Sequence, residues 1–278
     1  MKQYRDLLIR AGILLAGIII IFSCISRLFL AGSDTLSEYA QKNPQLAYNE
    51  SQEAVPTSTP ASTAAPSPEP TPTENPQALV MKQFYYAPLT EKQKEFITGC
   101  SYPDTTEELV ISYDDLHYVH ILHYDFEGSV VEGELICNKA IAQDLIEIFY
   151  ELYLNEYQLA RVTLIENYNG DDTLSMTDNN TSCFNYRVVP DTEKLSQHAY
   201  GLAIDINPFY NPYITYEQDG SMKISPMGSE MYADRTAEFP YKIDENDLCY
   251  RLFKAHGFTW GGDWNYSKDY QHFQKAIP

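Results

Sequence analysis

The chain has 278 residues, and its 39 Asp and Glu residues exceed its 19 Lys and Arg residues, which gives a formal charge of −20. This balance argues against nucleic-acid binding, because phosphate recognition depends on clustered Lys and Arg, and the sequence contains no such cluster. Charged residues make up 21% and hydrophobic residues 44% of the chain, as in a folded domain rather than a disordered chain.

Residues 1–32 are predicted to form a short cytoplasmic stub and a transmembrane signal anchor. Three basic residues lie within the first ten positions, and a largely apolar run follows from residue 11 to residue 30. A run of about 20 residues matches the thickness of a bilayer core, and the basic flank predicts that the N-terminal end stays in the cytoplasm. The alternative is a cleaved signal peptide, for which Ala31-Gly32-Ser33 offers an imperfect cleavage site.

Residues 33–78 are predicted to be a disordered linker. Seven of the 16 prolines lie between Pro56 and Pro76, interleaved with Thr and Ser. Proline favours an extended backbone, and these polar residues offer no apolar surface to bury. At about 3.1 Å per residue, the Pro-rich part could hold the following domain about 65 Å from the membrane.

Residues 79–278 have the size of one globular domain, which we expect outside the cytoplasm. Segments 118–126 and 158–166 are rich in β-branched, Tyr and Leu residues and are predicted to be strands. Hydrophobic residues at helical spacing follow Asn138 as far as Leu152, and a second helix is predicted over 246–256. The domain is therefore expected to be α+β, with a small mixed or antiparallel sheet and flanking helices.

Several common active sites are absent. The chain contains no H-E-x-x-H, G-x-x-x-x-G-K-[ST], G-x-S-x-G or S-x-x-K pattern. The four cysteines after the apolar segment occur singly, which argues against a zinc ribbon or a thioredoxin-like site and leaves disulfide pairing open: Cys100, Cys137, Cys183 and Cys249.

The first candidate site residues lie in a dense stretch from residue 196 to residue 208. Large apolar residues alternate with small or polar ones over 202–206, which is typical of a strand with one face toward a core, so Asp205 is expected on the opposite face. His198 lies seven residues earlier, and Gly201 is the position where the chain can turn between the two side chains. Imidazole and carboxylate groups are zinc ligands, so this pair predicts part of a zinc site.

A second dense stretch, residues 260–273, contains the third candidate ligand, His272, with Asp269 three residues before it. Two histidines and one aspartate leave the fourth tetrahedral position open to water, which is typical of catalytic zinc. Zinc brings the pKa of its water toward about 7, while a nearby carboxylate carries the proton to the leaving amine. Asp269 is placed for this second role.

With these residues the sequence resembles the zinc peptidases of bacterial peptidoglycan that include VanY-like D-alanyl-D-alanine carboxypeptidases and L-alanyl-D-glutamate endopeptidases. Their pattern, S-x-H-x-x-G-x-A-x-D followed by a distal acidic residue and x-x-His, is matched in order by Ser196, His198, Gly201, Ala203, Asp205, Asp269 and His272. The resemblance covers roughly residue 118 to the C-terminus. It implies Zn²⁺ bound by His198, Asp205 and His272, with Asp269 as the catalytic base. It also implies that Arg187 binds the developing oxyanion.

One position departs from part of this family. The dipeptidase branch has Glu before the last histidine, where this chain has Asp269. Together with Trp260-Gly-Gly-Asp-Trp264 and His272-Phe-Gln, the pattern is more similar to the endopeptidase branch. The scissile bond stays open, because relatives with this pattern are assigned to both activities.

Other interpretations of these residues remain. Asp269 could orient His272 instead of acting as a base, and Arg187 could form a structural ion pair. Trp260 and Trp264 could either line a substrate groove or pack in the core. Three further histidines have a spacing that matches no known metal signature and are predicted to be structural: His117, His120 and His123.

The sequence therefore predicts a membrane-anchored zinc metallopeptidase that faces outward and hydrolyses an amide bond in the peptide stem of peptidoglycan. One alternative is a catalytically inactive, zinc-containing domain that binds or senses the cell wall. Another is an acidic wall-binding protein without metal.

Overall fold

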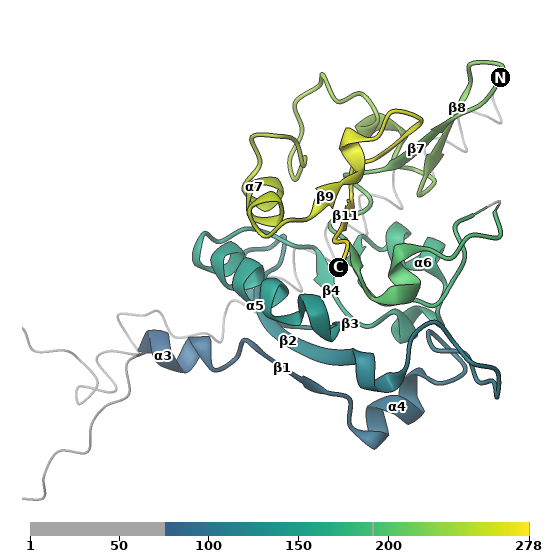
Figure 1. Cartoon of the computed structure of the whole chain (residues 1–278). Helices are drawn as coiled ribbons and strands as arrows, with labels where there is room; N and C mark the ends of the chain where they lie inside the picture. Colours follow the sequence, from purple (N-terminus) through teal and green to yellow (C-terminus); the bar gives the residue numbers. More distant parts are fainter. Residues whose placement is uncertain (1–75, 191, 278) are drawn as a thin grey trace, which may run out of the picture. The chain divides into compact units, whose positions relative to one another are not determined.

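The computed structural model describes residues 76–190 and 192–277. The predicted anchor and nearly all of the predicted linker lie outside the described residues. Among the residues that are described, no helix is long and apolar enough to span a bilayer. Helices and small, mostly antiparallel sheets are mixed along this part of the chain, which confirms the α+β class (Figure 1).

The α-helices are α3 (Pro76–Met81), α4 (Glu91–Ile97), α5 (Lys139–Leu154), α6 (Asp172–Thr177) and α7 (Leu248–Ala255). The 3-10 helices are η2 (Tyr113–Asp115), η3 (Ile165–Tyr168), η4 (Gln197–Tyr200), η5 (Glu230–Tyr232) and η6 (Gly261–Asp263). The strands are β1 (Tyr85–Pro88), β2 (Leu116–Tyr124), β3 (Val130–Asn138), β4 (Arg161–Val162), β5 (Asn180–Thr181), β6 (Ala203–Asp205), β7 (Tyr213–Tyr216), β8 (Met222–Ser225), β9 (Thr259–Trp260), β10 (Ser267–Asp269) and β11 (His272–Gln274).

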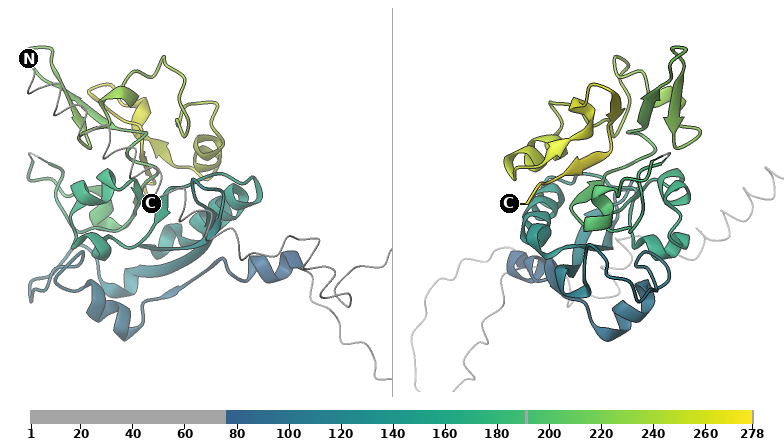
Figure 2. Two further views of the ribbon diagram at one scale, coloured as in Figure 1. Left: turned by 180° about the vertical axis from the view of Figure 1, so that it is seen from behind. Right: turned by 45° about the vertical axis from the view of Figure 1, so that its right-hand side comes forward.

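The strands divide among several small sheets, where the sequence predicted a single one. Within residues 76–277, three antiparallel sheets have the strand orders β1-β2-β3, β10-β7-β8 and β6-β11-β9, and β4 and β5 form a parallel pair. Strands of two to four residues build the second and third of these sheets, shorter than the usual length of about five to six residues. Both views in Figure 2 show the β7–β8 hairpin standing apart from the β1-β2-β3 sheet.

Helix α5 covers the β1-β2-β3 sheet and closes the main core (Figure 1). Its N-cap, Asn138, accepts a hydrogen bond from the amide of Ala140 at 3.0 Å. The apolar face of α5 is fully or almost fully buried, as the spacing of the sequence predicted: Ile141, Leu145, Ile148, Phe149 and Leu152. Burial of such side chains contributes roughly 1.5–3 kcal/mol each, so this face anchors the domain.

One predicted strand is wrong. Strand β2 confirms the prediction over 118–126 with a shift of two residues, but segment 158–166 contains only the two-residue β4 and the start of η3. The apolar residues of this segment are buried, yet side chains bind much of its backbone. Asn207 Oδ1 accepts the amide of Ala160 at 3.0 Å, and Asn180 Oδ1 accepts that of Thr163 at 2.9 Å. The composition of this segment therefore indicated that its apolar side chains are buried, but not that its backbone pairs in a sheet.

The second predicted helix is confirmed as α7. Asp247 caps its first turn by accepting the amides of Cys249 and Tyr250 at 2.8 and 3.3 Å. Its last turn ends at His256, followed by Gly257.

Gly201 makes the turn between the two halves of the first motif. It ends η4 in the left-handed conformation with φ of 64°, and its carbonyl accepts the amide of Asn138 at 2.8 Å. A Cβ at Gly201 would lie 2.6 Å from that amide nitrogen. The end of η4 is thus fixed against the start of α5, and only glycine fits there.

Gly201→Ala is expected to lower the free energy of unfolding by about 3 kcal/mol, because the left-handed backbone and the close contact both oppose a side chain. Gly220→Ala is the matched control: Gly220 has φ of 84°, but a Cβ there would meet nothing within 4 Å. We expect a loss of about 1 kcal/mol for this control. Urea unfolding measures both variants, and equal losses would contradict the role of the contact with Asn138.

Candidate metal centre and active site

Three separate segments bring His198, Asp205 and His272 together. His198 lies in η4, whose N-cap Ser196 accepts the amide of His198 at 3.3 Å. Asp205 ends β6, and His272 begins β11. These two strands pair in antiparallel register with His272 opposite Asp205. The described residues contain one group of His, Cys, Asp and Glu side chains arranged to hold a metal ion, and it consists of these three.

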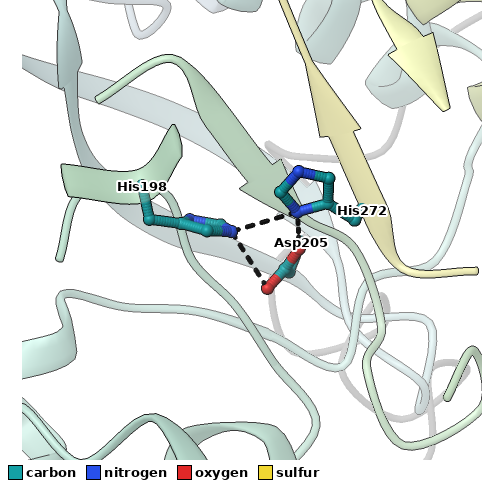
Figure 3. Close-up of side chains that lie close together, drawn as sticks. All are labelled: His198, Asp205 and His272. Atoms are coloured by element: carbon teal, nitrogen blue, oxygen red, sulfur yellow. Dashed lines mark hydrogen bonds and ion pairs between the residues drawn. The ribbon is translucent and has the colours of Figure 1, made fainter. Parts of the chain in front are cut away.

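The ligand atoms of the three side chains point toward one another and lie slightly closer together than in a tetrahedral zinc site (Figure 3). His198 Nε2 lies 3.2 Å from His272 Nδ1 and 3.3 Å from Asp205 Oδ2. His272 Nδ1 lies 3.0 Å from Asp205 Oδ1. Two ligands that are each about 2.0–2.2 Å from zinc at a tetrahedral angle are about 3.3–3.6 Å apart, so small shifts suffice to accommodate the ion.

Neighbouring groups orient both imidazoles. His198 donates from Nδ1 to the carbonyl of Cys183 at 2.5 Å, which leaves Nε2 toward the centre. His272 donates from Nε2 to Gln274 Oε1 at 3.0 Å, which leaves Nδ1 toward the centre. Such partners fix the tautomer of metal-binding histidines. In their neutral forms the two histidines therefore direct lone pairs, beside a carboxylate, at one point, and this donor set suits a divalent cation.

The electrostatics of the centre favour a positive charge. Burial raises the pKa of Asp205, but the charges and hydrogen bonds of His198 and His272 outweigh it and hold this pKa well below its usual value. Burial lowers the pKa of His272, but its hydrogen bond to Asp205 and the nearby negative charge raise it to about 9. A proton on His272 thus occupies the place of the cation, so metal and proton compete for the site.

Asp269 lies at the end of β10 and has a buried oxygen facing no donor. Its Oδ1 has no hydrogen-bond partner within residues 76–277. Burial raises the pKa of Asp269 to about 7, against the lowering effect of His272. A carboxylate with such a pKa can take and return a proton near neutral pH. The alternative role for Asp269 has less support, since Asp205 and Gln274 are the partners of the two ring nitrogens of His272.

A hairpin brings Arg187 next to the first motif. Residues 183–189 and 194–198 run antiparallel, and the carbonyl of Arg187 accepts the amide of Ser196 at 3.0 Å. The guanidinium forms an ion pair with Asp172 at 2.8 Å, as expected if Arg187 has a structural role. Its Nε is buried without a hydrogen-bond partner in the described part of the chain.

One of the two tryptophans packs in the core, and the other lies beside the three candidate ligands. Trp260 is a core residue, because only 5% of it is exposed and its Nε1 donates to the carbonyl of Tyr270 at 2.9 Å. The ring of Trp264 lies 5.3 Å from the ring of His272, measured between centroids. Trp264 is therefore the tryptophan that borders the centre.

The remaining candidates stay apart from the centre. The β2 histidines join no metal-binding group of the described residues, and alternation along the strand puts His120 on the face opposite His117 and His123. His120 instead bonds the carbonyl of Gln83 through Nδ1 at 2.7 Å. The four cysteines named above are free thiols.

Three contributors to the site were not predicted from the sequence. Gln274 shares a face of β11 with His272, and its spacing of two residues was a usable signal. The carbonyl of Cys183 is a backbone group, so residue type carries no information about it. Asp172 precedes Arg187 by 15 residues, and only the folded chain reveals their pairing.

The segment that carries this centre is similar to a known family of peptidases. Residues 190–275 match the profile of a family described as D-alanyl-D-alanine carboxypeptidase, which confirms the resemblance to the VanY-like peptidases. The matched segment includes His198, Asp205, Asp269 and His272, whereas Arg187 lies just before it. Neither the curated proteins nor the solved structures gave a match to the chain.

Proposed function

We propose that the protein is a zinc-dependent metallopeptidase that hydrolyses an amide bond in the peptide stem of bacterial peptidoglycan. The observation that carries the proposal is the convergence of His198, Asp205 and His272, with Asp269 close enough to influence the pKa of His272. The match to a carboxypeptidase family over residues 190–275 supports the choice of substrate.

In this proposal zinc is held by Nε2 of His198, Nδ1 of His272 and the carboxylate of Asp205. When bound, it supplies a Lewis acid for the scissile carbonyl and lowers the pKa of the attacking water. Asp269 removes a proton from that water and delivers it to the leaving amine. Arg187 donates hydrogen bonds to the oxygen on which negative charge develops.

The proposal extends to location. The basic flank and apolar run within residues 1–32 support a single-pass anchor in the cell membrane, and the Pro-rich segment supports a spacer. The peptidase domain would then face the cell wall. A fusion of a periplasmically active reporter to the C-terminus should be active, and an inactive reporter would contradict this orientation.

The proposed activity is tested with the full-length chain in detergent and purified peptidoglycan. Mass spectrometry of the products is expected to show stem-peptide cleavage that stops with a chelator and returns with zinc. Release of free D-alanine would identify a carboxypeptidase, and cleavage after the first stem residue an endopeptidase. Zinc binding without cleavage would instead favour a binding or sensory domain, and the absence of bound metal would remove the zinc proposal altogether.

A further inference from the structure

The short helix α6 contacts two residues near the centre, Arg187 and Gln271, although no motif residue lies on it. Asp172, in its first turn, forms the ion pair with Arg187. Met176 lies one turn later on the same face, and its sulfur accepts a hydrogen bond at 3.5 Å from the side-chain Nε2 of Gln271, the residue before His272. Helix α6 therefore lies beside both parts of the motif.

The ion pair between Asp172 and Arg187 is more protected from solvent than a typical surface pair. The two side chains are 20% and 23% exposed, compared with 46% and 54% for Asp178 and Arg161 at the other end of α6. Charges interact more strongly where solvent is partly excluded, so the first pair holds its geometry better than the second.

One nitrogen of Arg187 remains available. The guanidinium contacts Asp172 through Nη2, while Nε is buried and has no acceptor among the described residues. A buried donor without a partner is unfavourable, and a ligand oxygen would satisfy it. The positive charge of Arg187 also lowers the pKa of Asp269, against the larger raising effect of burial, so the guanidinium lies near the proposed base.

We propose that Asp172 is a positioning residue that fixes the guanidinium of Arg187 so that its Nε–H is directed to the oxygen of the scissile amide. The inference rests on the proposed function, because it requires Arg187 to act on the substrate. The long side chain of arginine has many rotamers, and the ion pair with Asp172 restricts this freedom before the substrate binds. A guanidinium fixed in advance stabilises developing charge without reorganisation.

The test compares Asp172→Asn with wild type in stem-peptide cleavage by the full-length protein. We expect kcat to fall about 10- to 100-fold, less than the loss of about 10²- to 10³-fold typical of removing an oxyanion donor, while KM changes little. Zinc content should match that of wild type. Asp178→Asn is the matched control, because it breaks the other ion pair of α6, and its kcat is expected to equal that of wild type.

A double-mutant cycle separates positioning from a general structural effect. If Asp172 acts through Arg187, adding Asp172→Asn to Arg187→Met should cause no further loss of kcat/KM. Losses that multiply in the double variant would overturn the inference. So would an unchanged or increased kcat for Asp172→Asn, because an increase would mean that Asp172 holds Arg187 away from the substrate.

Asp172→Glu provides the test if Asp172→Asn does not fold. It keeps the charge but moves the carboxylate by one methylene, so kcat is expected to fall by a smaller factor than in Arg187→Met, and an unchanged kcat would count against positioning. The two failures are distinguishable: wild-type protein that cleaves no stem peptide contradicts the proposed function. Active wild-type protein with an unaffected Asp172 variant contradicts only this inference.

Discussion

Asp269→Asn is expected to lower the rate of stem-peptide cleavage by about 10²- to 10⁴-fold, the usual contribution of a positioned general base. The substitution is nearly isosteric, but an amide cannot accept the proton of the attacking water. Asp269 is not among the three side chains that converge on the metal site, so zinc should remain bound at the wild-type level. Steady-state kinetics and metal analysis of the same preparation measure both quantities.

The control for this variant is Asp263→Asn. Asp263 lies six residues before Asp269, but it is exposed, pairs with Lys254 at 3.2 Å and is not one of the three candidate ligands. Its activity is expected to stay near that of wild type. Near-normal cleavage by Asp269→Asn would remove Asp269 from the mechanism, whereas loss of zinc from this variant would show that it supports the metal instead.

His198→Ala is expected to abolish both zinc binding and cleavage. His198 is 3% exposed, and the remaining Asp205 and His272 would form a two-ligand site that binds zinc weakly. A ligand at about 1,000 times its dissociation constant stabilises a protein by about 4.1 kcal/mol, and the variant would lose this contribution. Thermal unfolding with and without a chelator measures the effect.

The comparison within each protein makes this test specific. A chelator should lower the melting temperature of wild type but leave that of His198→Ala unchanged. His256→Ala is the matched control, because this half-buried histidine contacts Asp144 at 3.1 Å and lies outside the centre. It should keep the response to the chelator. A chelator response in His198→Ala equal to that of wild type would exclude His198 as a ligand.

The sequence predicted the parts of this structure that depend on local patterns. The helix after Asn138 follows from spacing and a cap, and the turn at Gly201 follows from the residue type. The same approach failed for most of segment 158–166, because buried apolar residues occur both in sheets and in segments whose backbone is hydrogen-bonded by side chains, here Asn207 and Asn180. Pattern alone cannot tell these two environments apart.

The candidate site also combines features that the sequence predicts with features that it does not. His198, Asp205 and His272 were predicted because metal ligands come from few residue types at defined spacings. The pairing of Asp172 with Arg187 could not be predicted, because an aspartate near an arginine in sequence is common and most such residues lie in solvent. The orientation of His198 depends on the Cys183 carbonyl, and every residue possesses a carbonyl.

The position of the ligands along the chain has a consequence for how the protein depends on its surroundings. Asp205 and His272 are 67 residues apart, so an ion held by both would close a long loop in the way that a disulfide does. Since the four cysteines of the described residues are free thiols, this closure would come from the ion alone. Loss of the ion would then expose the intervening segment to proteolysis and hydrogen exchange, and the amount of intact protein would follow the supply of the ion.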